Sequence, residues 1–329
     1  MIENLVAAQA KRVTISEFSQ AVNIPLRTLH LWKRSTVACA SIRGRKSKPA
    51  NRLSLPERKA IVDVLLRPEW SDLSPRTIYY KLLDEELRII ASPATFYRVA
   101  LENDLSARRG VRTTGRKLNR ETPHLAAIKP NEIWSWDVSQ IRSSLRTNRF
   151  YLYVIIDIWS RYVVGWLLEA HEKSSHAIEM WKKALEDQVI TGKGLINHKD
   201  NGSIMTSDEM ICFVNDAQMV DSYSRAGVSD DNPFSESLFS SIKRFREFPD
   251  SFDNIQNARV YFETYFSTYN HEHRHSGIQF IAPSARHYGE EEKILNIRNN
   301  VIHSFYEENP HRYSNKPKIY TPISEVKIN

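Results

Sequence analysis

The spacing of the hydrophobic residues changes along this chain of 329 residues. Up to about residue 104, the apolar positions recur every three or four residues, which predicts amphipathic helices. Past Pro130 they gather in short, strand-like runs separated by polar turns. The pattern therefore predicts an all-helical part followed by a part that mixes strands and helices.

Residues 14–34 predict two short helices around a tight turn. Asn23 can adopt the left-handed conformation that such a turn needs, and Ile24-Pro25 opens the second helix. Three apolar residues of that helix should face inward: Leu26, Leu29 and Trp32. Four polar residues are left outside: Arg27, Thr28, His30 and Lys33. The segment resembles a helix-turn-helix whose second helix enters the DNA major groove, and a plain helical hairpin is the alternative.

Residues 53–104 contain three further helix starts. Each is a Ser followed within two residues by Pro, at Ser54, Ser74 and Ser92. Glu57 follows Ser54 at the spacing of a capping box. The third helix carries polar and aromatic residues: Thr95, Tyr97 and Arg98. We predict a second helix-turn-helix here, with a plain three-helix bundle as the alternative.

The part after Pro130 predicts a sheet. Strand-like runs cover residues 133–138, 150–156 and 162–168, and the last two are close enough to form a hairpin. Helices and short strands then alternate: a helix at 174–188, a strand at 195–197, a helix at 207–215, a strand at 218–223 and a helix from Pro233. This order is that of an α/β ribonuclease-H-like domain, a mixed sheet with helices.

These patterns divide the chain into six segments. They are a helix-turn-helix at 1–34, a basic linker at 35–52, a second helix-turn-helix-like segment at 53–104, a second basic linker at 105–130, the ribonuclease-H-like catalytic core at 131–289, and a C-terminal helix and tail at 290–329. We expect the C-terminal helix to end at about Ile302. The fold is thus an α/β core preceded by all-α DNA-binding segments.

The net charge of +7 is distributed unevenly. Residues 1–130 carry 24 Lys and Arg against 12 Asp and Glu, whereas residues 131–329 carry 22 against 27. A basic half favours DNA phosphates, and an acidic half can hold metal ions. Cys39 and Cys212 supply neither a zinc module nor a disulfide framework. With no secretory signal and no apolar run of about 18 residues, we expect a soluble cytoplasmic protein.

Three acidic residues carry the candidate chemistry. We expect Asp137 to end a strand, Asp200 to follow another strand, and Glu236 to lie on a helix. Mg²⁺ prefers carboxylate oxygens, and two such ions about 4 Å apart can position and neutralise a phosphodiester. Converging carboxylates at these positions therefore suggest cutting and joining of DNA strands.

The helix that carries Glu236 is predicted to have two faces. Asn232 can cap this helix, and Pro233 suits its first position. At about 100° per residue, Glu236, Ser240 and Lys243 lie within about 60° of one another. The opposite side is apolar, so one face packs while the other presents a carboxylate with a cation two turns away.

The surroundings of these acids resemble the catalytic cores of DDE transposases and retroviral-type integrases. The matching segments are Trp136-Asp137-Val138, residues 156–161, residues 198–203, residues 222–227, and residues 231–236 with Lys243. The closing segments resemble those of insertion-sequence-three family transposases: Tyr269-Asn270, Arg274-His275, Pro283-Ser284 and residues 309–313. The resemblance covers roughly residues 54–329.

This resemblance implies functions for individual residues. It implies metal binding and catalysis by Asp137, Asp200 and Glu236, with two Mg²⁺ or Mn²⁺ ions in each active site. It also implies that Lys243 contacts substrate DNA near the scissile end. Lys199 and Asn201 depart from the family pattern, which has Ser before the second acid and often Arg after it. These departures put the local DNA contacts in question more than the catalysis.

We predict further DNA contacts in the two helical segments, in both linkers and near the end of the core. These are Arg27, Thr28, Lys33, Arg43, Arg45, Lys46, Thr95, Arg98, Arg108, Arg109, Arg274 and His275. Core contacts are the alternative for Arg274 and His275. Asp157 is expected to support the structure rather than bind metal, and a zinc site at His271, His273 and His275 is disfavoured.

The leading hypothesis is an insertion-sequence transposase that binds terminal inverted repeats and catalyses metal-dependent cleavage and strand transfer. One alternative is a DNA-binding regulator with an inactive catalytic relic, and another is a ribonuclease-H-like nuclease without joining activity. The expected partners are double-stranded DNA, as repeats and as target, and further copies of the chain assembled on it. We expect the protein in the bacterial cytoplasm, on the nucleoid when bound, with residues 1–104 binding the element's ends largely on their own.

Overall fold

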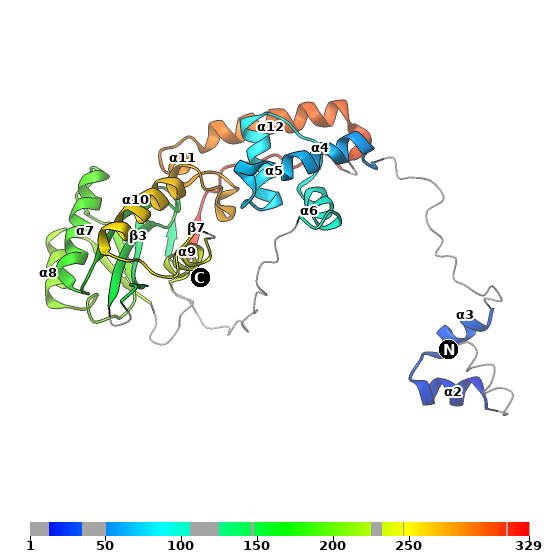
Figure 1. Cartoon of the computed structure of the whole chain (residues 1–329), viewed down its shortest axis with the longest axis horizontal. Coiled ribbons are helices and arrows are strands. Elements are labelled where there is room, and N and C mark those ends of the chain that lie inside the picture. The colour runs from blue at the N-terminus through cyan, green and yellow to red at the C-terminus, as the bar shows by residue number, and fades with distance from the viewer. Residues whose placement is uncertain are drawn as a thin grey trace. The chain divides into compact units, whose positions relative to one another are not determined.

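A computed structural model describes residues 13–34, 51–105, 125–145, 148–224, 232–245, 247–313 and 315–328 (Figure 1). The chain divides into two compact units, Met1–Arg52 and Leu53–Asn329. Most of the two basic linkers lies outside the described residues. Five predicted DNA contacts lie outside them as well: Arg43, Arg45, Lys46, Arg108 and Arg109.

The first unit contains helices α2 (Ile15–Val22) and α3 (Leu26–Arg34). Between them, Asn23 has the predicted left-handed backbone, with φ of 51°. Leu29 is buried, but Leu26 is 44% exposed, so the prediction that Leu26 faces inward is wrong. Leu26 is the first residue of α3, where the helix has no preceding turn to cover it. The tight turn between two helices is confirmed.

Three helices open the second unit: α4 (Leu55–Leu65), α5 (Pro75–Glu85) and α6 (Pro93–Glu102), with a short 3-10 turn, η1 (Pro68–Trp70), after α4. The predicted capping box is present, because the Ser54 N–H donates to Glu57 Oε2 at 2.8 Å and the Glu57 N–H donates to Ser54 Oγ at 3.4 Å. Ser74 and Ser92 precede α5 and α6 as predicted. Local cap sequence therefore sets where these helices begin.

The core of these three helices includes residues from the far end of the chain. Ile302, on α12 (Glu291–Glu308), is buried in the same cluster as Ile78 and Phe96, and Tyr320 packs against it. Helix α12 also continues to Glu308, past the predicted end at Ile302. The helical segment and the C-terminal segment thus share one hydrophobic core.

A five-stranded sheet forms the centre of the second unit. Its strands are β2 (Ile133–Arg142), β3 (Arg149–Asp157), β4 (Val163–Glu169), β5 (Ile196–Lys199) and β6 (Val220–Tyr223), in the spatial order β4-β3-β2-β5-β6. The pairs β2–β3 and β3–β4 are antiparallel, whereas β2–β5 and β5–β6 are parallel. This mixed sheet with helices on both faces is the predicted ribonuclease-H-like fold.

Strand β2 is longer than predicted. It continues past Val138 to Arg142, because Ser139 to Arg142 pair with Leu152 to Arg149 of β3. Asp137 therefore lies within a strand, and the prediction that it ends one is wrong. The other two placements are confirmed, since Asp200 directly follows β5 and Glu236 lies on α9 (Pro233–Arg244).

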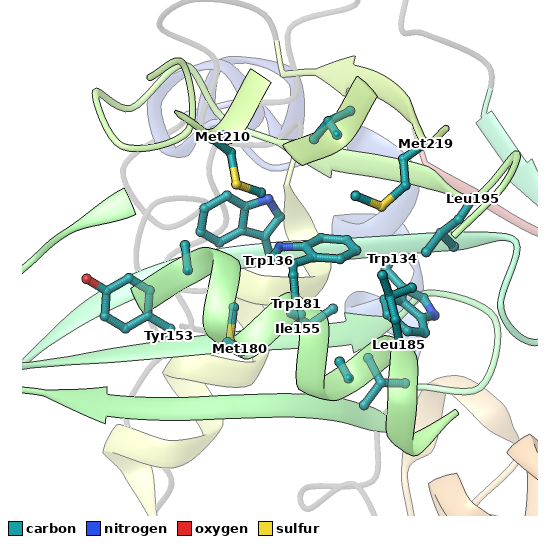
Figure 2. Packing of buried hydrophobic residues seen from close by; sticks show 14 of the residues in the cluster. Trp134, Trp136, Tyr153, Ile155, Met180, Trp181, Leu185, Leu195, Met210 and Met219 are labelled. Carbon is teal, nitrogen blue, oxygen red and sulfur yellow. The ribbon is translucent and has the colours of Figure 1, made fainter. Parts of the chain in front are cut away.

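One face of the sheet packs against α7 (Ser174–Asp187) and α8 (Asp208–Asp216). Trp134 and Trp136 of β2 point to this side and meet Trp181 of α7, with ring centroids 5.5 Å and 6.4 Å apart (Figure 2). These side chains are fully buried, so this cluster fixes β2 against α7. The three Trp residues are core residues.

The other face packs against α9 and α10 (Ile255–His271). Leu238 and Ile242 of α9 and Phe262 and Phe266 of α10 are buried against β3 and β4. At the outer strand, the Asn270 side chain accepts from the Val163 N–H at 2.8 Å and donates to the Val163 carbonyl at 3.0 Å. Helix α10 thus covers the sheet and also binds the free side of β4.

The remaining elements close the second unit. They are η3 (Ser276–Ile278), α11 (Pro283–His287), η4 (Pro310–Arg312), and a two-stranded sheet in which β1 (Leu125–Ala127) pairs antiparallel with β7 (Val326–Ile328). No helix in the described part of the chain is long and apolar enough to cross a membrane.

Candidate active site

Alternate residues of β2 turn three polar side chains toward α9. Trp134 and Trp136 occupy one face of the strand, so Ser135, Asp137 and Ser139 lie on the other. Ser135 contacts the start of α9 and Ser139 contacts its end. The strand and the helix therefore run side by side, with Asp137 between two fixed contacts.

The start of α9 is held on β2 by buried hydrogen bonds. The Ser135 hydroxyl donates to Asn232 Oδ1 and shares a 2.8 Å hydrogen bond with Ser235. Asn232 Nδ2 donates to the Trp136 carbonyl at 3.3 Å. Asn232 is the N-cap residue as predicted, but its side chain makes no capping bond because these contacts with β2 occupy it. The network fixes Glu236, one residue after Ser235, beside Asp137.

Asp137 carries a strongly perturbed carboxyl group. Burial raises its pKa to about 7, and the negative charges of Asp200 and Glu236 act in the same direction. A hydrogen bond from the Val138 N–H, 2.7 Å from Oδ1, and the charge of Lys243 oppose the rise in pKa. Asp137 thus lies within the electrostatic reach of both other predicted acids and of the predicted cation.

Asp200 reaches this position through the parallel pairing of β2 and β5. Ser135 pairs with His198, and the same register continued by two residues sets Asp200 beside Asp137. Adjacent strands lie about 4.8 Å apart. The Gly202 N–H donates to Asp200 Oδ1 at 2.7 Å, which closes a turn after the strand. A Cβ atom on Gly202 would stand 2.9 Å from that oxygen, so the turn orients Asp200 only with glycine there.

The neighbour of Asp200 is a buried cation. Lys199 is fully buried, and its ammonium lies 2.9 Å from Asp221 Oδ2 on β6. Asp221 also accepts from Asn197 Nδ2 at 2.8 Å and from the Tyr223 hydroxyl at 2.9 Å. The charge of Lys199 is therefore paired with Asp221 inside the protein and does not face solvent. Asn201 likewise donates to the Ser224 carbonyl at 2.8 Å.

Glu236 and Lys243 meet Asp137 in a cavity of about 420 Å³. Its lining residues are Asp137, Val138, Ser139, Glu236, Phe239, Ser240, Lys243 and Arg244. The predicted polar face of α9, with Glu236, Ser240 and Lys243, is thus turned toward this cavity. Lys243 Nζ donates to Ser139 Oγ at 2.8 Å.

The donor set suits a hard divalent cation. Three carboxylates supply oxygen ligands of the kind that Mg²⁺ prefers, and a cation would offset both the burial and the weaker repulsion that raise the Asp137 pKa. Within the described ranges, however, no group of three or more His, Cys, Asp or Glu side chains is placed to hold one ion. Mg²⁺ often takes one or two carboxylates and keeps several waters, and this arrangement fits that mode.

The other described residues that were predicted to contact DNA lie on separate helices of the two units. Arg27 and Arg98 are exposed, and Thr28 and Thr95 are half-buried. Thr95 accepts a 3.2 Å hydrogen bond from Arg98 and shares one of 3.1 Å with Ser92. The Lys33 and Trp32 side chains lie outside the described part of the structure.

Arg274 and His275 make contacts inside the second unit. The Arg274 guanidinium lies 3.1 Å from Asp84 Oδ2 and 3.5 Å from Glu85 Oε1, both on α5. His275 Nδ1 accepts from the Gly277 N–H at 3.0 Å, and burial lowers the pKa of His275 to about 3. These contacts within the protein are compatible with the alternative of core contacts, and DNA binding by Arg274 and His275 stays a prediction.

Asp157 has the structural contacts expected from its sequence position. It is fully buried, and its carboxylate accepts from the Asn131 N–H, the Ser160 N–H and the Ser160 hydroxyl, each at 2.7 Å. The Ser160 hydroxyl also lies 2.8 Å from His287 Nδ1. This network stabilises the turn between β3 and β4.

Sequence reasoning missed Ser135, Ser139 and Arg244 as parts of the site. The two serines could have been found, because a strand that alternates Trp with Ser and Asp presents them on the face of Asp137. Arg244 had no such signal, since a basic residue in the last turn of a helix is common.

The sequence of this chain is similar to known family models and known proteins. Residues 127–229 match the family model described as "Integrase core domain", and residues 218–283 match a second model with the same description. The transposase for insertion sequence element IS904 of Lactococcus lactis is 30% identical over 161 residues, 48% of this chain and 61% of that protein. Transposase InsF for insertion sequence IS3A of Escherichia coli is 28% identical over 158 residues, 48% of this chain and 54% of that protein.

Among solved structures, the HTLV-2 integrase catalytic core domain in complex with magnesium is 20% identical, with a TM-score of 0.37. The match covers 49% of this chain and 98% of that one. The matches to the two transposases named above span between half and two thirds of the length of those proteins.

Proposed function

We propose that this chain, a member of the DDE transposase and integrase superfamily, is the transposase of an insertion sequence. It binds the terminal inverted repeats of its element and catalyses metal-dependent cleavage and strand transfer to a target. The relatives named above are bacterial transposases, which supports action on nucleoid DNA in a bacterial cytoplasm.

One observation carries the proposal. Asp137 and Glu236 line the same cavity as Lys243, and the charge of Asp200 acts on the Asp137 carboxyl group from the next strand. An acidic residue on a strand and another on a helix thus line one cavity with a cation, and the charge of a third acid acts on the first. Phosphoryl transfer needs mainly positioning and charge stabilisation, and this cavity offers groups for both.

Individual residues then take these roles. Asp137, Asp200 and Glu236 would hold the metal ions, Mg²⁺ or Mn²⁺, and Lys243 would bind the DNA strand. Bound there, such ions would supply charge compensation on the phosphate and activation of an attacking oxygen. Ser135 and Asn232 hold α9 against β2, so that Glu236 keeps its place relative to Asp137. Ser139 holds the ammonium of Lys243 at the cavity wall.

Two ends of one element must be joined in a coordinated way, so we propose a homo-oligomer assembled on DNA. Cyclic symmetry is the usual way for identical subunits to pair. Two exposed cations, Arg27 on α3 of the first unit and Arg98 on α6 of the second unit, are each proposed to contact DNA.

Cleavage of supercoiled plasmid DNA tests the proposal. The wild-type protein should nick or linearise the plasmid with Mg²⁺ and lose this activity with EDTA. Asp200→Asn should lower cleavage by at least a hundredfold. Asp216→Asn, an exposed acid on α8, is the matched control and should retain activity.

Joining of a pre-cut element end to a target plasmid is measured in parallel. Cleavage without joining would indicate a nuclease. DNA binding with neither cleavage nor joining would indicate a regulator with a relic core and would overturn the proposal.

A further inference from the structure

Two consecutive cations end helix α9 beside the predicted acids. Lys243 and Arg244 both line the cavity that contains Asp137 and Glu236. The sequence and the family resemblance had singled out only Lys243. The cavity thus has an acidic end and a basic end, both built from β2 and α9.

The ammonium of Lys243 is held at the basic end. It donates to the hydroxyl of Ser139, a residue only 9% exposed on the strand that carries Asp137. An ammonium has three N–H donors, so this hydrogen bond leaves two of them for another acceptor. Ser139 thereby keeps a cationic donor at a defined distance from the carboxylates.

Within the described residues, no partner occupies the donors of Arg244. It is exposed and makes no hydrogen bond or ion pair with any residue in the described part of the chain. A guanidinium carries five N–H donors in a planar fork that matches a phosphate. The helix dipole alone favours a cation in the last turn, but it does not require that the side chain line a cavity.

The distance between the two ends suits neighbouring phosphates of one DNA strand. Ser139 is two residues from Asp137, or about 7 Å along a strand, and Lys243 is seven residues from Glu236, or about 10 Å along a helix. Each step of one strand rises about 3.4 Å along the duplex axis and also turns around it, so neighbouring phosphates are about 7 Å apart through space. The basic end therefore lies about one or two nucleotides from a phosphate held between the acids.

We propose that Arg244, together with Lys243 tethered to Ser139, forms a phosphate subsite for the DNA backbone about one or two nucleotides from the reacting phosphate. This inference rests on the proposed function, because it takes the acidic end of the cavity as the place of reaction. Its ligand is a backbone phosphate, and Arg244 binds it without reading the base sequence.

The salt dependence of DNA binding tests this subsite without using activity. The full-length protein is titrated into a labelled duplex of about 30 base pairs at several KCl concentrations, with anisotropy as the readout. Each phosphate contact contributes about −0.9 to the slope of log K against log salt. Arg244→Gln should make this negative slope less steep by about 0.9 and weaken binding by about eightfold at 0.1 M salt.

Two control variants accompany Arg244→Gln. Arg244→Lys keeps the charge and should keep the wild-type slope. Lys182→Gln removes an exposed cation on α7, on the opposite side of the sheet, and should also leave the slope unchanged.

A wild-type slope for Arg244→Gln would overturn the subsite, whatever the protein does to DNA. A wild-type protein that binds DNA but neither cuts nor joins it would overturn the proposed function. If Arg244→Gln still made the salt slope less steep in that case, the phosphate contact would be supported although the proposed catalytic function would not. A protein with no affinity for the duplex would remove both proposals.

Discussion

At the scale of single residues, β2 carries three polar side chains that do three different things. Ser135 binds the start of α9, Asp137 lines the cavity, and Ser139 holds Lys243. Because strand side chains alternate, the spacing of two residues sets the distance between each pair of these groups. The position of the cation relative to the acid is therefore fixed by backbone geometry.

Removing the Ser139 hydroxyl should affect the reaction more than the fold. In Ser139→Ala the ammonium of Lys243 loses its anchor but stays exposed to water, so no buried charge is left unpaired. We expect strand joining to fall about tenfold, in line with one hydrogen bond to a charged group. The melting temperature should stay within a degree or two of the wild type. Ser139→Thr keeps the hydroxyl and should recover most of the rate.

Gly202 offers a test of how Asp200 is oriented. The Cβ atom of Gly202→Ala would stand 2.9 Å from Asp200 Oδ1, so the carboxylate would have to turn away. We expect up to about a hundredfold loss of cleavage, since small misplacements of reacting groups cost this much. Ser203→Ala, one residue later, serves as the control. Full activity of Gly202→Ala would show that the turn does not orient Asp200.

The residue types at the site could be predicted, but their contacts only in part. The placements of Asp200 after a strand and of Glu236 on a helix follow from local pattern, and both are confirmed. The bond between Ser135 and Asn232 joins residues 97 positions apart, so no local pattern contains it. Because the Asn232 side chain binds Ser135, it does not make the N-cap hydrogen bond that the local sequence predicts.

At the scale of elements, helix starts follow local sequence and strand ends do not. The capping boxes at Thr14 and Ser54 lie within four residues, and both helices begin where the cap places them. Strand β2 extends past Val138 because β3 offers hydrogen-bond partners as far as Arg149. Strand length is thus decided by the neighbouring strand, which a sequence window does not include.

The cap of α4 can be tested directly. Ser54→Ala removes the acceptor for the Glu57 N–H and the donor to the Glu57 carboxylate. We expect the free energy of unfolding of the second unit to fall by about 1 kcal/mol. Urea denaturation followed by circular dichroism measures this change. Ser175→Ala, exposed in α7, is the control, and an equal loss there would refute a capping effect.

At the scale of the whole molecule, the helices at 53–105 and the C-terminal segment stabilise each other. Arg298 of α12 is fully buried and binds both carboxylate oxygens of Asp84 on α5, at 2.6 Å and 2.8 Å. It also donates to the carbonyls of Gln279 and Phe280. One guanidinium thus joins α5, α12 and the loop before α11.

Arg298→Ala should therefore destabilise the second unit strongly. It would leave Asp84 with only Arg274 as an ionic partner among the described residues, in a largely buried setting. Breaking a buried ion pair in this way costs about 3–5 kcal/mol. Lys183→Ala, which removes the exposed pair with Asp187, should cost at most about 1 kcal/mol in the same denaturation experiment.

The shared core also changes how the helical segments predicted to bind DNA can be studied. Binding of element ends by residues 1–104 alone stays a prediction. A fragment that stops there lacks Ile302 and Tyr320, which pack with the residues of α4, α5 and α6. We expect such a fragment to unfold without cooperativity, whereas the full chain shows a sharp transition. A cooperative transition in the fragment would contradict this expectation.

The amide of Asn270 has a consequence for the storage and expression of this protein. The outer strand of a sheet is a template on which other chains can add strands and form aggregates. Here the Asn270 side chain occupies both backbone groups of Val163, and Arg259 donates to the Leu168 carbonyl near the other end of β4. Another chain would have to displace both side chains before it could extend the sheet from β4. Concentrated protein should therefore resist amyloid-like association along this edge.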